Sequence, residues 1–515
     1  MTASVADSGD EARSSLLSNS RWNLLGFACG LAANFVTVPF VVRWIGLPQF
    51  GRAGLMLAIT APLTLVGSVI GQALVRESTS RWNVGDAEGA RRTHDAALRL
   101  GLLAGAAGWV ALVLVGPGIT LAILGGVASR SGLTTSFVVA ATGWLAQQLC
   151  LVLQGGCAAR QDFRTVARVA AFSGAATVVA TLALTAAFPT VDGYLAGVAA
   201  SFALTLACWL WAQRDDVRVR AIAWANLRVE SRALLHFGKW QGLAQLAGAF
   251  GNQVDRYALG ALAPVAMVGQ YNVANRLQEA AYIGVVKAGE VLFPHFGSLA
   301  SKSIEERGRV FQGASWVVGT FSVMLLMPIV PLSTSVLALW IGPQVGPDAA
   351  VLLRTLVLGG IVGCGSNVFV YYAMGMGRNP PVAWISVMYS IATVLFTVLL
   401  IRAYGPLAAG AGLLVASMGR VAVSLVVTRR QFFPHLRWGE LLVSSVLPLA
   451  IGVALALGVH RLGYARAHNW MSLIAQYAGL AALVLAAIIV ASMLTQSGRD
   501  IVARTRASLR SSTAS

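Results

Sequence analysis

The chain has 515 residues, of which 57% are hydrophobic and only 11% are charged, and its formal net charge is +18. Ordinary soluble domains carry about 25% charged residues, so this composition excludes a soluble globular protein. A lipid bilayer accommodates so much apolar surface because it acts as an apolar solvent. We therefore expect an all-α membrane protein, since helices satisfy their own backbone hydrogen bonds in lipid.

Apolar windows of about 20 residues, the length that a spanning helix needs, recur from residue 22 to residue 498, and we count 14 spans. The window 310–353 is long enough for two spans. Proline and glycine residues mark a break in it, namely Pro328, Pro331, Gly342, Pro343 and Gly346. The spans predict two six-helix lobes and two C-terminal helices. In chain order the segments are a cytoplasmic tail (1–20), an N-lobe (21–213), a cytoplasmic loop (214–235), a C-lobe (236–428), spans 13 and 14 (438–494) and a cytoplasmic tail (495–515).

The charges are distributed unevenly between the predicted loops. Residues 1–20 are polar and contain acids, so we expect an uncleaved first span and no signal peptide. With the N-terminus in the cytoplasm, inside segments hold 26 of the 38 Lys and Arg residues and outside loops hold six. This is the positive-inside pattern, and it predicts a multi-pass protein with both termini in the cytoplasm. It also explains the net charge without nucleic acid as a partner.

A faint internal repeat appears at an offset of 218 positions. Arg21-Trp22 aligns with Lys239-Trp240, and further matches are Gly30 with Gly248, Asn34 with Asn252, and Gly51 with Gly269. A repeat of six spans preserves orientation, so the two halves would be parallel repeats. Transporters built in this way hold substrate between their halves near the midplane. Spans 13 and 14 fall outside the repeat.

Span 8 carries an unusual set of polar residues. On a helical wheel of about 100° per residue, they fall within an arc of about 80° and extend for about 27 Å along the axis. Charges inside a span are costly and usually face a cavity or a partner. The residues are Asn272, Arg276, Glu279, Lys287 and Glu290.

Span 7 has a similar face formed by Gln241, Gln245, Asn252 and Arg256. Lys239 lies at its cytoplasmic entrance, and Asp255 lies beside Arg256 near the far end. Two such helices predict a hydrated groove between the halves.

Simpler explanations stay open for most of these charges. Lys239 is close enough to the cytoplasm to snorkel. Asp255 and Arg256 can lie in the outer interface and pair or cap there. Ion pairs between Arg276 and Glu279, or between Lys287 and Glu290, would be structural. Arg354 and Arg420 lie nearer span ends, where snorkelling is the default.

The sequence shows no sign of catalysis. It has no phosphate-binding loop ending in Lys-Ser or Lys-Thr, and its six His residues have no metal-ligand spacing. The five cysteines fall inside predicted spans as small buried side chains, so we predict no disulfide or metal site. We therefore expect a transporter without a catalytic residue, a metal or a resident cofactor.

Two runs resemble the polysaccharide-unit (O-antigen or exopolysaccharide) flippases of the multidrug/oligosaccharidyl-lipid/polysaccharide exporter (MOP) superfamily. One run comprises Asp255-Arg256-Tyr257, Leu259-Gly260, Gly269, Tyr271, Ala274 and Arg276-Leu277. The other is Ile45-Gly46-Leu47-Pro48 with Phe50-Gly51, which is similar to the family's first outside loop. The resemblance extends over the whole chain in span count and lobe arrangement.

The resemblance implies a transporter of the bacterial inner membrane, working by alternating access. It would flip polyprenyl-pyrophosphate-linked oligosaccharide units across that membrane for surface polysaccharide biosynthesis. Its partners would be the lipid-linked glycan, membrane lipids and the polysaccharide polymerase machinery. By position, Arg256, Arg276 and Lys287 would meet the pyrophosphate or acidic sugars, with Lys239, Asn252 and Asn272 beside them. Asp255, Glu279 and Glu290 would be candidates for H⁺ or Na⁺ coupling.

Three alternatives stay open. A cation-coupled drug exporter of the same superfamily would need twelve spans, so spans 13 and 14 favour the polysaccharide branch. A lipid II flippase would also have 14 spans. A membrane glycosyltransferase or polymerase would need acidic residues in an early outside loop or a large outside loop, and neither is present in the sequence.

Overall fold

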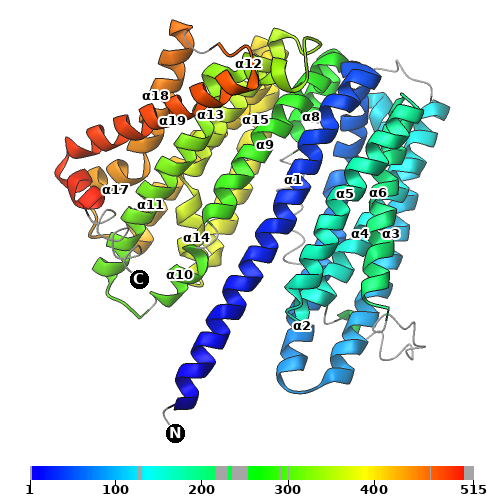
Figure 1. Ribbon diagram of the computed structural model, residues 1–515, viewed down its shortest axis with the longest axis horizontal. Helices are drawn as coiled ribbons and strands as arrows, with labels where there is room; N and C mark the ends of the chain where they lie inside the picture. The colour runs from blue at the N-terminus through cyan, green and yellow to red at the C-terminus, as the bar shows by residue number, and fades with distance from the viewer. Residues whose placement is uncertain are drawn as a thin grey trace. The chain divides into compact units, whose positions relative to one another are not determined.

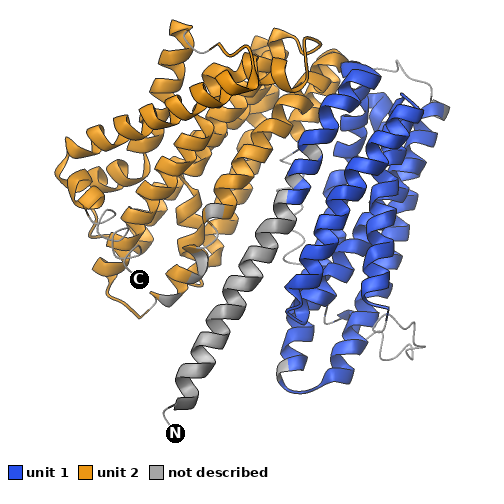
Figure 2. Cartoon of the chain, in the orientation of Figure 1, with its two compact units in different colours: residues 1–253 blue, residues 254–515 orange. Residues whose placement is uncertain are grey.

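A computed structural model describes residues 3–124, 130–214, 230–232, 234, 253–289, 292–299, 301–463 and 466–503, with most of their side chains from Cys29 onward. No strand occurs in these ranges. The contacts divide the chain into two compact units, residues 1–253 and 254–515 (Figure 2). The predicted all-α architecture is confirmed, whereas the assignment of six spans to each lobe stays a prediction.

The first unit consists of long helices (Figure 1). Asp86, Asp162 and Thr190 cap three of them, because their side chains accept the otherwise unpaired N–H groups of Gly89, Thr165 and Gly193. α4 packs against α2, α3 and α6, and α5 packs against α1 and α6. The elements are α1 (Ala3–Thr60), η1 (Ala61–Thr64), α2 (Leu65–Asn83), α3 (Ala87–Ile123), α4 (Arg130–Ala159), α5 (Phe163–Ala187) and α6 (Val191–Ala212).

α1 contains a kink at Gly46, where φ is 78° and ψ is 161°. The positive φ is accessible to glycine at little cost. The apolar segment Phe35–Trp82 has 48 residues. A straight helix of that length would measure about 70 Å, more than twice the hydrocarbon thickness of about 30 Å. The kink therefore separates two crossings, as the sequence predicted.

Small residues bring α2 and α4 into close contact. A Cβ added at Gly71 would lie 2.8 Å from the carbonyl oxygen of Leu151, and one at Gly155 would lie 2.7 Å from that of Gly71. Gly67, four residues before Gly71, donates its N–H to Oε1 of Gln148 at 2.5 Å. This is the small-residue spacing that lets membrane helices approach closely.

An ion pair fastens the segment after α6 to the first unit. Arg81 of α2 donates from both terminal nitrogens to the carboxylate of Glu230, at 2.8 and 2.7 Å. Thr93 of α3 donates to the same carboxylate at 3.2 Å. Leu234 is 2% exposed and packs in a cluster with Leu74 and its neighbours. Residues 230–232 and Leu234 therefore belong to the body of this unit.

The second unit is also helical, and two of its predicted spans are broken. α11 and α12 are separated by Met327 and Pro328, and α13 and α14 by Gly365 and Ser366. Its elements are α8 (Val254–Leu262), α9 (Val265–Gly289), α10 (Leu292–Ser298), α11 (Ile304–Leu326), α12 (Ile329–Trp340), α13 (Pro347–Cys364), α14 (Asn367–Gly375), α15 (Asn379–Tyr404), η2 (Pro406–Ala408), α16 (Ala409–Val427), η3 (Thr428–Phe432), α17 (Trp438–Ser445), α18 (Leu447–Leu462) and α19 (Trp470–Met493).

The prediction that the window 310–353 holds two spans is wrong. Ile304–Trp340 forms one crossing length, and Pro347–Gly375 forms the next. The break at Pro328 lies inside the first crossing, because proline removes one backbone donor without ending the helical direction. The true turn is the Gly342–Gly346 segment, where Gly342 has a φ of 109°.

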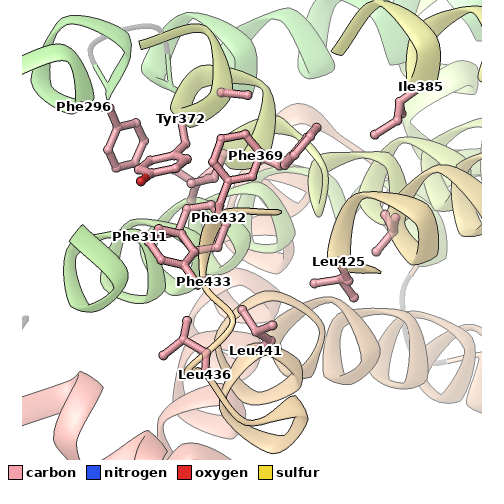
Figure 3. Packing of buried hydrophobic residues seen from close by; sticks show 14 of the residues in the cluster. Phe296, Phe311, Phe369, Tyr372, Ile385, Leu425, Phe432, Phe433, Leu436 and Leu441 are labelled. Atoms are coloured by element: carbon pink, nitrogen blue, oxygen red, sulfur yellow. The ribbon is translucent and has the colours of Figure 1, made fainter. Parts of the chain in front are cut away.

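Aromatic side chains fill the core of the second unit where α10, α11, α14 and η3 meet (Figure 3). The rings of Phe296 and Tyr372 lie edge to face with centroids 5.2 Å apart, and Phe311 and Phe433 lie 5.3 Å apart. Tilted and edge-to-face pairs of this kind add to the stabilisation from burial alone. This cluster holds the ends of these four elements together.

Exposed apolar side chains show where lipid must contact the protein. In the described ranges, ten helical segments are long and apolar enough to cross a membrane, or eleven with the pair α17 and α18, which is bent by 48°. α15 exposes Trp384 (71%), Ile391 (61%) and Leu399 (51%) along one face. Such a continuous stripe of exposed apolar side chains is unfavourable in water. The structure therefore confirms a multi-pass membrane protein.

Candidate functional site

Asp255 joins three helices of the second unit. It lies in the first turn of α8 and is 7% exposed. Its Oδ2 accepts a hydrogen bond from the Tyr271 hydroxyl of α9 at 2.5 Å, and its Oδ1 accepts one from the Thr397 hydroxyl of α15 at 3.0 Å. A carboxylate in a first helical turn is also favoured by the helix dipole. Both oxygens are thus engaged in holding α8, α9 and α15 together.

Arg256 is the centre of a second polar cluster. Its Nε donates to Oδ1 of Asn272 at 2.8 Å, and its Nη2 lies 3.7 Å from Oε1 of Glu279. Nδ2 of Asn275 donates to the same Glu279 oxygen at 2.7 Å. The Arg256 side chain is 10% exposed, whereas that of Glu279 is 44% exposed. The guanidinium is therefore buried and balanced, and the cluster opens on the Glu279 side.

These bonds decide between the explanations that the sequence left open. Asp255 and Arg256 are not exposed interface residues, because both are buried and bonded to neighbouring helices. The structural ion pair between Arg276 and Glu279 is absent, since Glu279 is engaged by Arg256 and Asn275. The structure therefore brings Arg256, Asn272 and Glu279 together as one group.

Arg276 and Lys287 lie apart from this group. Both are half-buried on α9. In the part of the chain that the structure describes, no hydrogen bond or ion pair engages the Arg276 guanidinium. Eleven residues of helix place the two cations within about 20° of each other on the wheel. Arg276 is thus a half-buried cation of the predicted span 8 that forms no ion pair among the described residues.

Three predicted site residues, Lys239, Asn252 and Glu290, lie outside the described residues, as do Gln241 and Gln245 of the predicted span 7 face. The groove predicted between the two halves therefore stays a prediction. The snorkelling explanation for Arg420 is incomplete, because its guanidinium lies over the Tyr389 ring at 5.0 Å. Arg354 donates to the Ala350 carbonyl at 3.0 Å within its own helix.

Sequence reasoning missed several partners in these clusters. Tyr271 and Thr397 carry ordinary hydroxyls, which occur in many spans and give no signal. Asn275 and Gln278 did give a sequence signal, because amide side chains are uncommon in an apolar helix. They were missed because they lie outside the arc of the helical wheel that holds the charged residues. Both are buried, at 9% and 7% exposure. The buried amides of α9 therefore extend the polar face toward the interior of the unit.

Known structures share this fold. Lipid II flippase MurJ in an inward closed conformation superposes with a TM-score of 0.73 at 11% identity, over 93% of this chain and 99% of that one. An inward-facing multidrug resistance MATE family transporter of the MOP superfamily gives 0.67 at 14% identity, over 78% and 94%. A MOP superfamily transporter from Pyrococcus furiosus gives 0.58 at 15%, over 81% and 95%. No curated protein sequence matches significantly.

The fold is therefore that of the MOP superfamily of membrane transporters, with a charged cluster on α8 and α9. The family model described as polysaccharide biosynthesis protein matches residues 16–300, more than half of the chain. The protein belongs to this polysaccharide biosynthesis family, and the resemblance seen in the sequence is confirmed.

Proposed function

We propose that this protein flips polyprenyl-pyrophosphate-linked oligosaccharide units from the cytoplasmic to the periplasmic leaflet of the bacterial inner membrane by alternating access. The observation that carries the proposal is the family match over residues 16–300, which includes all of α8 and α9. A pyrophosphate head that crosses lipid needs cationic partners, and guanidinium groups suit it through paired hydrogen bonds. The polyprenyl tail can stay in the bilayer during the crossing.

Arg276 is the first contact that we propose for the pyrophosphate. Its guanidinium has no partner among the described residues, so binding an anion there breaks no existing bond. Lys287 lies on the same side of α9 and adds a second charge, and Lys239 and Asn252 are proposed to contribute from span 7. Removal of the Arg276 guanidinium therefore weakens binding without removing a bond that holds the fold.

Arg256 is proposed to meet the substrate in exchange for Glu279. The contact between Nη2 and Oε1 is 3.7 Å, longer than a good charge-assisted hydrogen bond of about 2.7–2.9 Å. A proton or Na⁺ on the exposed Glu279 carboxylate would weaken this contact and free the guanidinium for phosphate oxygens. We favour Glu279 over Asp255 as the coupling group, because both Asp255 oxygens already accept hydrogen bonds.

A lipid II flippase is the second candidate function. The observation in its favour is the likeness to MurJ over 93% of this chain. Both candidate substrates share the polyprenyl-pyrophosphate group, so the proposed roles of Arg276 and Lys287 are the same for each. The two functions differ in the glycan that accumulates when transport stops.

The test uses a strain that lacks this gene and has no redundant flippase. It is complemented with wild type, Arg276→Ala, Lys287→Ala or the control Arg402→Ala. Arg402 suits the control because it is exposed in the last turn of α15. Extracted polyprenyl-pyrophosphate glycans are then analysed. We expect full-length repeat units to accumulate and to be cleared by wild type and the control but not by the first two variants. Accumulated lipid II would favour the second candidate, and truncated glycans would indicate a transferase. Unchanged lipid-linked glycans would contradict the proposal.

A further inference from the structure

A small cavity lies in the second unit, away from the α8–α9 cluster. Its volume is about 280 Å³, near the lower end of the range for small-molecule sites. Segments far apart in the sequence form it: the start of α11, the turn before α17, α17 itself and the chain after α19. Its lining includes Glu305, Gln312, His435, Leu436, Glu440 and Asp500.

Gln312 gives the cavity an unused hydrogen-bonding group. Its side chain lines the cavity and is only 8% exposed. Among the described residues its amide has no hydrogen-bond partner. The amide atoms are accessible from the cavity, so a ligand bound there can form hydrogen bonds with Gln312 without breaking an existing one.

The charge of the cavity is opposite to that of the surrounding face. Three carboxylates line it, those of Glu305, Glu440 and Asp500, and Arg309 supplies a single permanent positive charge. These four charged side chains leave two net negative charges. They lie where the positive-inside pattern places the cytoplasmic surface, in a protein whose net charge is +18. An acidic cavity on a basic face selects for cations.

The spacing of these carboxylates argues against a bare metal ion. No group of three acidic, His or Cys side chains in the described ranges is close enough to hold one. One Glu440 oxygen also accepts the Arg437 backbone N–H at 3.2 Å. The cavity is thus suited to a larger cation that carries several N–H donors and can reach separate acceptors.

We propose that this cavity binds a small organic cation with primary ammonium groups. An ammonium group donates three hydrogen bonds, which can satisfy two carboxylates and the Gln312 carbonyl oxygen together. A diamine matches the two net negative charges. The same ammonium chemistry is present in free diamines and in the ethanolamine headgroup of a phospholipid. A bound ligand would contact both Asp500, which follows α19, and Gln312 of α11, and so would link these two segments.

The test uses the full chain in nanodiscs of phosphatidylcholine and phosphatidylglycerol, which contain no primary amine. Putrescine and spermidine are titrated by calorimetry against wild type, Asp500→Asn, Gln312→Leu and the control Glu306→Gln. Glu306 lies on the same helix and pairs with Lys302 at 3.5 Å, outside the cavity. We expect saturable binding of the amines to wild type and to the control variant. Binding to the two cavity variants should be about tenfold weaker, as loss of one charge-assisted hydrogen bond predicts. Tetramethylammonium should not bind, because it has no N–H donor.

A second arm distinguishes the two sources of the ligand. Nanodiscs that contain phosphatidylethanolamine would raise the apparent Kd of the diamine if the headgroup occupies the cavity, and would leave it unchanged if the ligand is a free amine. Binding that is equal in wild type, Asp500→Asn and Gln312→Leu would overturn the proposal. The proposal would also be overturned by two results obtained together: no saturable binding of the amines, and equal retention of phosphatidylethanolamine by wild type and Asp500→Asn.

Discussion

Replacing Thr397 by valine removes one hydroxyl donor from Asp255 and keeps the shape of the side chain. Thr397 is fully buried, and its hydroxyl lies 3.0 Å from the carboxylate. An acceptor left unsatisfied in the interior costs about 1–3 kcal/mol. Hydrogen bonds between helices in membranes average about 0.6 kcal/mol and reach about 1.7 kcal/mol. Since the acceptor here is a carboxylate, we expect Thr397→Val to lower the free energy of unfolding by about 1–2 kcal/mol.

The measurement is unfolding in mixed micelles on addition of denaturing detergent, followed by tryptophan fluorescence. Thr393→Val is the matched control, because Thr393 lies one turn earlier on α15, is 4% exposed and donates to the Tyr389 carbonyl of its own helix at 2.8 Å. Its loss should change stability by less than about 0.5 kcal/mol, because no bond between helices is removed. Equal effects of the two substitutions would refute the role assigned to the Asp255 contact.

Three other substitutions test the packing. Gly412→Ala should destabilise the protein by about 1–3 kcal/mol in the same assay, because the new Cβ would lie 2.6 Å from the backbone of Thr397 on α15. The control Gly419→Ala should be neutral or stabilising, because no atom lies within 4 Å of the added Cβ. Glu230→Ala should cost about 2 kcal/mol, because the largely buried Arg81 guanidinium loses its counter-charge and keeps only the Gly89 carbonyl as a partner. The more exposed Glu306→Ala should cost under about 0.5 kcal/mol. Equal losses would contradict this account. Ser492→Ala removes the acceptor of a tryptophan N–H at 3.0 Å and should increase proteolysis of the last span, and unchanged cleavage would argue against that bond.

Hydropathy and charge predicted most of the fold because the bilayer imposes length and polarity on every span. The error at 310–353 has a local cause. Pro328 and Gly342 look alike as breaks in a sequence, yet one lies inside a crossing and the other lies between two crossings. Only the packing of α11 and α12 against α13 and α18 decides which break reverses the chain.

The candidate site was predictable as a face of α9 but not as a set of bonds. Helical periodicity places Asn272, Arg276 and Glu279 on one arc, because it depends only on spacing. It cannot show that Glu279 is bonded to Arg256 while Arg276 has no such bond, since that depends on how α8 docks. Thr397 lies 142 positions from Asp255, and no local pattern connects them.

The central claim is that this protein moves a polyprenyl-pyrophosphate-linked glycan across a membrane. The most direct measurement reconstitutes the purified chain in liposomes with a fluorescent polyprenyl-pyrophosphate oligosaccharide and follows its exposure to a membrane-impermeant glycosidase. We predict that wild type transfers the glycan between leaflets and that Arg276→Ala slows transfer at least about tenfold, as loss of one bidentate phosphate contact implies. Transfer by wild type no faster than in protein-free liposomes would contradict the account.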